Sequence, residues 1–235
     1  MISLTLIFIS SFYQSQWFVD TLHVGDGAVL NNVIVAFDNG RLSQISPNSA
    51  QSDDFEYVAD AHMTPGLIDA YSYMGVEGNT LEESRESTAS IHLSDSLIFD
   101  SPAFSFALAE GVTTAYLSPA SRNVIGGLGC LVKTTGGQPA SLFSNNVVAE
   151  LIEDAAALKI TLGGDPSYGN TTGSGKWTTT YRARRPTTRM GTVWVVRREF
   201  YRAVEYRDLR EKGQVPFNPD LEVLTRALSG DLLVR

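Results

Sequence analysis

The residue types that most often carry chemistry are few in this sequence. It has three histidines, His23, His62 and His92, and a single cysteine, Cys130. No two histidines are spaced two or four residues apart, so their spacing does not pair them as metal ligands, and we interpret each as a surface or partly buried histidine. One cysteine can form neither an intrachain disulfide nor a cysteine-based zinc site. Because no histidine lies near it in sequence, we expect Cys130 to be a small buried thiol and not a nucleophile.

Two glycine-rich segments could bind phosphate, but neither fits a known loop. The GSGK segment that ends at Lys176 resembles the end of a phosphate-binding loop. The first glycine of that pattern would fall on Asn170, however, and Trp177 stands where the Mg²⁺-binding hydroxyl should be. The GGLG run at 126–129 is followed by no helix whose N-terminus could face a phosphate. We therefore interpret both segments as turns or loops.

The N-terminal part predicts a small β-sheet with tight turns. β-rich runs cover residues 17–24, 29–37 and 41–45, and short segments rich in Gly, Asp and Asn separate them. Asn39-Gly40 is a strong hairpin signal, because both central positions of a type I′ turn favour positive φ.

After Pro65 the pattern changes, and strands alternate with helical stretches as in a βα barrel or an open α/β sheet. We predict a buried strand at 66–70, a helix at 102–110 that ends at Gly111, a strand at 112–117, a hairpin at 123–135 turned by its glycines, a strand or helix end at 157–162, a long loop at 163–188, a helix at 188–212, a short helix that begins at Asn218-Pro219 and ends at Gly230, and a strand at 232–234.

The long helix at 188–212 combines an apolar stripe with many charges. Residues 151–235 carry a net charge of +4 and residues 1–150 one of −12, within a total of −8. The charges along the helix are mixed in sign, so we interpret them as a solvated face and expect no nucleic-acid partner. Steps of three and four predict that one packed face carries Met190, Val193, Val196, Phe200 and Val204.

The segment TPGLIDAYSY at 64–73 resembles the entry to the barrel in the amidohydrolase superfamily, of the imidazolonepropionase-like kind. Other blocks resemble the same family in the same order: VGDGAVLNNVIVAFDNGRLSQI looks like its N-terminal β-sandwich segment, and AEGVTTA like its step from helix to second strand. NVIGGLGCLVKT, ALKITLGGDPSYGN and RRPTTRMGTVWVVRREFYRAVEY resemble blocks of bacterial amidohydrolases. The resemblance implies an α/β fold, with a small β-sandwich segment over residues 17–64 and an incomplete (β/α) barrel of the metal-dependent hydrolase type, a TIM barrel in complete members, over residues 65–235.

The resemblance also implies a metal site that this sequence does not complete. In the family, two histidines one residue apart point the same way from the first barrel strand and hold the metal together. Tyr71 and Tyr73 stand at those positions, and a phenol with a pKa of about 10 is a poor zinc ligand beside imidazole. Lys159 is the one candidate for the lysine that bridges two metals in some relatives, and the alternative is an ordinary exposed lysine. We expect Asp69, a motif residue, to hydrogen-bond locally and to hold the strand end in a supporting role.

The function that the resemblance implies is hydrolysis of a C–N bond, in an amide or cyclic amide of a small-molecule substrate, by water activated on Zn²⁺ or a similar cation. We expect this chain to bind no metal, and we identify no catalytic residue in it. The leading hypothesis is therefore an amidohydrolase-family protein that is inactive as given. The alternative is a non-catalytic amidohydrolase-like protein that serves as a binding or scaffold module.

Two expectations concern location and assembly. The apolar residues 1–16 favour a signal peptide and export to the periplasm or the extracellular space, and the alternative is an additional edge strand in a cytoplasmic protein. No run of eighteen apolar residues suggests a transmembrane span. A full barrel needs about 250 residues. Because 170 of the 235 residues follow Pro65, we expect a barrel fragment that exposes strand edges and forms aggregates or homo-oligomers.

Overall fold

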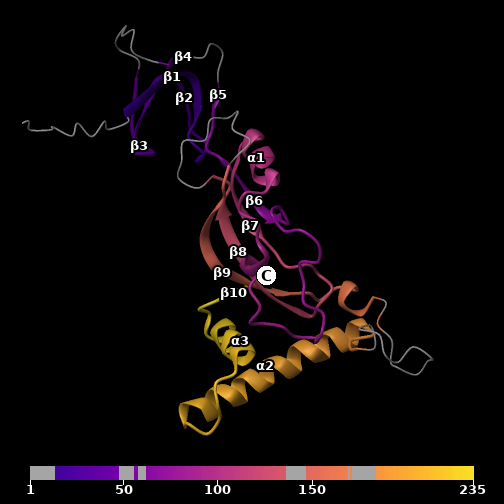
Figure 1. Cartoon of the computed structure of the whole chain (residues 1–235). Coiled ribbons are helices and arrows are strands. Elements are labelled where there is room, and N and C mark those ends of the chain that lie inside the picture. Colours follow the sequence, from indigo (N-terminus) through magenta and orange to yellow (C-terminus); the bar gives the residue numbers. More distant parts are fainter. Residues whose placement is uncertain (1–13, 48–55, 58–61, 136–146, 169, 171–183) are drawn as a thin grey trace, which may run out of the picture. The chain divides into compact units, whose positions relative to one another are not determined.

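The computed structural model describes residues 14–47, 56–57, 62–135, 147–168, 170 and 184–235. The chain divides into two compact units, residues 1–65 and 66–235, and each is described by itself (Figure 1). Residues 1–13 of the predicted signal peptide and the GSGK segment lie outside the described residues.

The first unit is a five-stranded sheet. Its central strand β1 (Gln14–His23) pairs antiparallel with β2 (Val29–Asp38), and β2 pairs antiparallel with β3 (Arg41–Pro47). Two short strands, β4 (Glu56–Tyr57) and β5 (His62–Met63), run parallel to β1 on its other side. The described residues form one sheet here, so the second layer of the expected β-sandwich is not among them.

The β2–β3 connection confirms the predicted hairpin. Asn39 has φ of 50° and Gly40 has φ of 73°, as a type I′ turn requires. Val19 and Leu22 of β1 form a buried apolar cluster with Val33 and Val35 of β2.

The second unit contains a mixed sheet with the strand order β10-β9-β8-β7-β6, and Figure 1 shows this sheet curled. Its strands are β6 (Leu67–Ser72), β7 (Val112–Leu117), β8 (Ile125–Lys133), β9 (Glu150–Ile160) and β10 (Leu233–Val234). β6 and β7 run parallel, as do β9 and β10, whereas β8 is antiparallel to both of its neighbours. The expected alternation of parallel strands and helices is therefore found in the β6–β7 and β9–β10 pairs of this sheet, and not around β8.

The predicted glycine-turned hairpin at 123–135 is wrong, because the segment is the single central strand β8. Its glycines permit close packing and do not make a turn. A Cβ atom on Gly129 would lie 2.4 Å from Tyr116 Oη and 2.6 Å from Leu117 O. A Cβ atom on Gly127, which has φ of 99°, would lie 2.5 Å from Ile91 O.

The predicted buried strand at 66–70 exists as β6, but it is not buried. Leu67 is 58% exposed and Ile68 is 70% exposed. β6 forms the edge of the sheet and pairs only with β7 among the described residues. The apolar run therefore predicted the strand correctly, but the prediction that this strand is buried is wrong.

The helices begin and end where their capping residues predict. α1 (Pro102–Ala109) lies just before Gly111, which has φ of 85°. The Asn218 side chain accepts a hydrogen bond from Leu221 N (3.1 Å) at the start of α3 (Pro219–Ser229), and Gly230 ends that helix in the left-handed conformation. Two short 3₁₀ helices, η1 (Leu93–Ser96) and η2 (Asp165–Ser167), lie in the connections.

The long helix α2 (Arg189–Glu211) exists as predicted, but its packed face is different. Met190, the first residue of the predicted face, is 81% exposed, whereas Glu199 is buried. Arg198 (2.6 Å) and Arg202 (2.8 Å) form ion pairs with the Glu199 carboxylate, and this pairing permits its burial. The buried residues of α2 are Thr192, Val195, Glu199, Ala203 and Tyr206.

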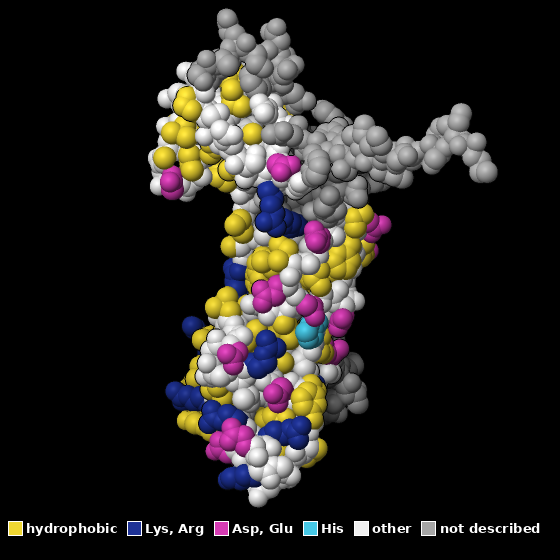
Figure 2. Space-filling view, turned by 90° about the vertical axis from the view of Figure 1, so that its left-hand side faces the viewer, with side chains coloured by type: hydrophobic (Ala, Val, Ile, Leu, Met, Phe, Trp, Pro, Cys, Tyr) yellow, Lys and Arg dark blue, Asp and Glu magenta, His cyan; other side chains and the backbone are white. Residues whose placement is uncertain are grey.

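Two apolar clusters hold the second unit together. One lies between the β8–β9 part of the sheet and the helices α2 and α3, and the other lies beneath α1 and η1. Lys/Arg and Asp/Glu side chains alternate over the α2–α3 end of this unit in Figure 2, as the mixed-sign sequence predicts for a solvated face. None of the described helices combines the length and apolar character that a membrane crossing requires.

Candidate functional site

The two motif tyrosines form the centre of the candidate site. Tyr71 lies near the end of β6 and Tyr73 directly follows that strand, with Ser72 between them, so the extended backbone directs both side chains to one side. Their hydroxyl oxygens lie 2.5 Å apart, and their rings meet edge to face with centroids separated by 5.3 Å. The Asp69 carboxylate accepts a hydrogen bond from Tyr71 N (3.0 Å), which is the local contact that the sequence predicts at this strand end.

Lys159 reaches the same place from β9. Its ammonium nitrogen donates to Tyr71 Oη at 3.3 Å and lies 4.8 Å from the centroid of the Tyr71 ring. The residue is only 9% exposed, so the alternative of an ordinary exposed lysine is wrong. The structure thus brings together the two tyrosines and the one lysine that the sequence singled out.

Two further residues complete a group that we call the Tyr71 cluster: Tyr71, Tyr73, Ser121, Lys159 and Arg235. Ser121 Oγ lies 3.5 Å from Tyr71 Oη. The Arg235 guanidinium lies 5.0 Å from the Tyr71 ring centroid and donates a hydrogen bond to Ala70 O. Sequence reasoning missed Ser121 and Arg235, since neither belongs to a recognisable motif and each is at least fifty residues from Tyr71 in sequence.

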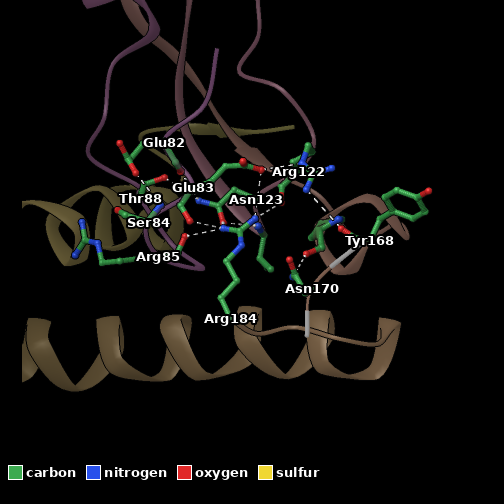
Figure 3. A network of polar contacts seen from close by, with 12 residues as sticks. Glu82, Glu83, Ser84, Arg85, Thr88, Arg122, Asn123, Tyr168, Asn170 and Arg184 are labelled. Carbon is green, nitrogen blue, oxygen red and sulfur yellow. Dashed lines mark hydrogen bonds and ion pairs between the residues drawn. The ribbon is translucent and has the colours of Figure 1, made fainter. Parts of the chain in front are cut away.

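An ionic network anchors the loop that carries Ser121 (Figure 3). The Glu83 carboxylate accepts from Arg122 Nε at 2.8 Å and forms an ion pair with Arg184 Nη2 at 3.4 Å. Arg184 also donates to Arg122 O (2.9 Å), and Asn123 donates from its side chain to Glu82 O (3.1 Å). Ser121 therefore precedes two residues whose side chains and backbone are held in place.

The electrostatics of the cluster shift the pKa values of the two phenols in opposite directions. Burial alone would raise the pKa of Tyr71, but hydrogen bonds with the neighbouring hydroxyls and Lys159, and the positive charge of Lys159, outweigh it and lower the pKa to about 8. Burial, the hydrogen bond with Tyr71 and the charge of Tyr71 raise the pKa of Tyr73 to about 12. Tyr71 is therefore the phenol that ionises first, and Tyr73 remains a hydrogen-bond donor.

The three histidines take part in contacts of their own. His23 and His62, on the paired strands β1 and β5, place two ring nitrogens 3.1 Å apart with stacked rings. Sequence spacing could not predict this contact, because strand pairing creates it. His92 Nδ1 forms an ion pair with the Asp154 carboxylate at 2.7 Å.

Cys130 is a buried thiol, as predicted. Burial, followed by the negative charge of Asp154, raises its pKa to about 11. A thiol with this pKa is almost wholly protonated at neutral pH and is a weak nucleophile.

The Tyr71 cluster does not fit a divalent metal ion. Within the part of the chain that the structure describes, no group of three or more His, Cys, Asp or Glu side chains could hold one. The cluster itself offers phenols and a hydroxyl beside the Lys159 ammonium, and the positive charge of that ammonium opposes a second cation at short range.

A solved structure supports the fold. Neither the scan against protein-family models nor the search of the curated proteins gives a match. Among solved structures, the chain is similar to the amidohydrolase from Thermotoga maritima MSB8, with a TM-score of 0.70 and 24% sequence identity over 92% of this chain. The chain has an amidohydrolase-like fold. It spans 56% of the length of that amidohydrolase, and at this level of identity the similarity concerns the fold alone.

Proposed function

We propose that this chain is an amidohydrolase-like protein that binds a small molecule at the Tyr71 cluster without a metal ion, and that it does not hydrolyse C–N bonds through metal-activated water as given. The observation that carries the proposal is the contact of the Lys159 ammonium with Tyr71 Oη at 3.3 Å. The family that the sequence resembles has imidazoles at the positions of Tyr71 and Tyr73. A phenol pair with a fixed cation is suited to hydrogen bonding and charge recognition, whereas an imidazole pair is suited to a metal.

Metal analysis of the purified full chain tests this proposal. After gel filtration we expect less than about a tenth of an equivalent of Zn, Mn, Fe, Co or Ni, because phenols beside an ammonium are poor ligands. The neighbouring ring nitrogens of His23 and His62 could retain a metal by themselves, so a His23→Ala/His62→Ala variant is the matched control. About one equivalent of metal that survives in this variant would contradict the proposal.

A variant that is expected to gain zinc binding provides a second test of the same proposal. Tyr71→His/Tyr73→His restores two imidazoles, separated by Ser72, at the end of β6, and we expect this variant to retain more Zn than the wild-type chain does. Equal and negligible zinc in both proteins would show that the remaining ligands are also missing.

A second candidate function is metal-dependent C–N hydrolysis in a longer protein that includes this sequence. The fold similarity to an amidohydrolase favours it, since the chain covers only 56% of that protein. Hydrolysis of amides or cyclic amides that depends on added Zn²⁺ or Mn²⁺, and that disappears in Lys159→Met, would support this candidate over the first.

A further inference from the structure

We propose that the ligand of the Tyr71 cluster is a small oxyanion, a carboxylate or a phosphate, held by Lys159 and Arg235. This inference rests on the proposed metal-free site and adds the chemical class of its ligand.

The first argument is the position of Lys159, which is only 9% exposed as a residue. An ammonium group that leaves water needs a compensating charge or a full set of hydrogen bonds. It has three N–H donors, and among the described residues Lys159 makes one hydrogen bond, to a phenol. No described carboxylate forms an ion pair with it. An anion would supply both the missing charge and the missing acceptors.

The second argument is the chemistry around the ammonium. The Arg235 guanidinium lies over the Tyr71 ring, and a guanidinium binds carboxylate and phosphate oxygens through paired N–H groups. The hydroxyls of Tyr73 and Ser121 are further donors beside Tyr71. A negative side chain also acts on these phenols, because the charge of Asp165 raises the pKa of Tyr73. We therefore place the anion at the Lys159 end of the cluster.

The third argument supplies an observable. The Lys159 charge stabilises ionised Tyr71, and a bound anion would oppose that ionisation. Binding of an oxyanion should therefore raise the pH at which Tyr71 ionises, and ionisation of Tyr71 should weaken anion binding by the same factor.

The experiment titrates the full chain with acetate, succinate and inorganic phosphate at constant ionic strength, in the presence of a chelator. Two-dimensional NMR shifts report binding, and tyrosinate absorbance reports the ionisation of Tyr71. We expect saturable binding that Lys159→Met weakens at least about tenfold, the factor expected when one charge-assisted hydrogen bond is lost. Arg235→Gln, which changes an exposed residue, should weaken binding in the same direction. Lys133→Met, at an exposed position of β8, is the matched control and should bind as the wild type does.

The outcomes separate the two proposals. Carboxylate-only or phosphate-only binding that requires Lys159 identifies the source of the oxyanion and supports the inference. Absence of saturable binding by metal-free protein overturns the inference and leaves the metal-free site intact. Binding that is equal in the wild type, Lys159→Met and Arg235→Gln also overturns it. Binding that occurs only after metal is added contradicts the proposed function itself.

Discussion

At the scale of single residues, the pairing of Tyr71 with Lys159 changes what the motif strand can do. In the family that the sequence resembles, the motif places two histidines on one side of the first barrel strand. Tyr71 and Tyr73 keep that arrangement here, with their hydroxyl oxygens 2.5 Å apart. The tyrosines differ from each other in their surroundings, because only Tyr71 contacts Lys159. One phenol therefore becomes easier to ionise, and the other becomes harder to ionise.

A spectrophotometric titration tests this difference. The wild-type spectrum minus that of Tyr71→Phe should contain one phenol that ionises near pH 8, since the pKa of Tyr71 is lowered to about 8. Lys159→Met should move this ionisation to higher pH, because it removes both a hydrogen bond and a positive charge. Lys133→Met should leave it unchanged. The absence of any phenol that titrates well below pH 10 in the wild type would contradict the geometry of the cluster.

The sequence identified residues of the candidate site only where they lie within one short motif. The resemblance of residues 64–73 to a family motif singled out Tyr71, Tyr73 and Asp69, and the contact of Asp69 with the backbone of Tyr71 is local. Ser121 and Arg235 could not be found in this way, because strand order in the folded sheet brings them to Tyr71.

At the scale of secondary-structure elements, the sequence predicted turns and helix caps correctly. It did not predict correctly which residues pack against other elements. The Asn39-Gly40 turn and the Asn218 and Gly230 caps depend on backbone conformation within a few residues, and all three exist as predicted. The face of α2 and the path of β8 depend on partners distant in sequence. Glycine is equally compatible with a turn and with close packing, so its presence in β8 could not decide between them.

The role of the β8 glycines gives a stability prediction. Gly129→Ala would place a methyl group against Tyr116 Oη and the backbone oxygen of Leu117, which cannot move away cheaply. We expect it to lower the free energy of unfolding by about 3 kcal/mol, the upper range for overpacking. Gly163→Ala is the control, since a Cβ atom there meets nothing within 4 Å. Urea unfolding followed by circular dichroism measures both, and equal midpoints would mean that β8 does not pack as described.

At the scale of the whole molecule, the described residues cover the apolar surface of the second unit unevenly. In the second unit the two clusters around β7, β8 and β9 are buried. The β6 edge is not, and Leu67 and Ile68 both lie exposed on it. Hydrophobic pattern predicts that a strand forms but not which neighbours cover it, so this exposure was visible only in the structure.

The exposed β6 edge predicts association of the isolated chain. A strand that has one unpaired edge and presents apolar side chains favours pairing with another copy and binding of hydrophobic dyes. We expect the wild-type chain to form oligomers or aggregates that light scattering detects, and Ile68→Lys to reduce both the scattering and the dye fluorescence, because a charge on an edge strand opposes strand pairing. Phe217→Lys is the matched control, since Phe217 is also exposed but lies outside the sheet, before α3. Equal reduction by both variants would indicate general surface stickiness, and a wild-type monomer that binds no dye would show that the β6 edge is protected.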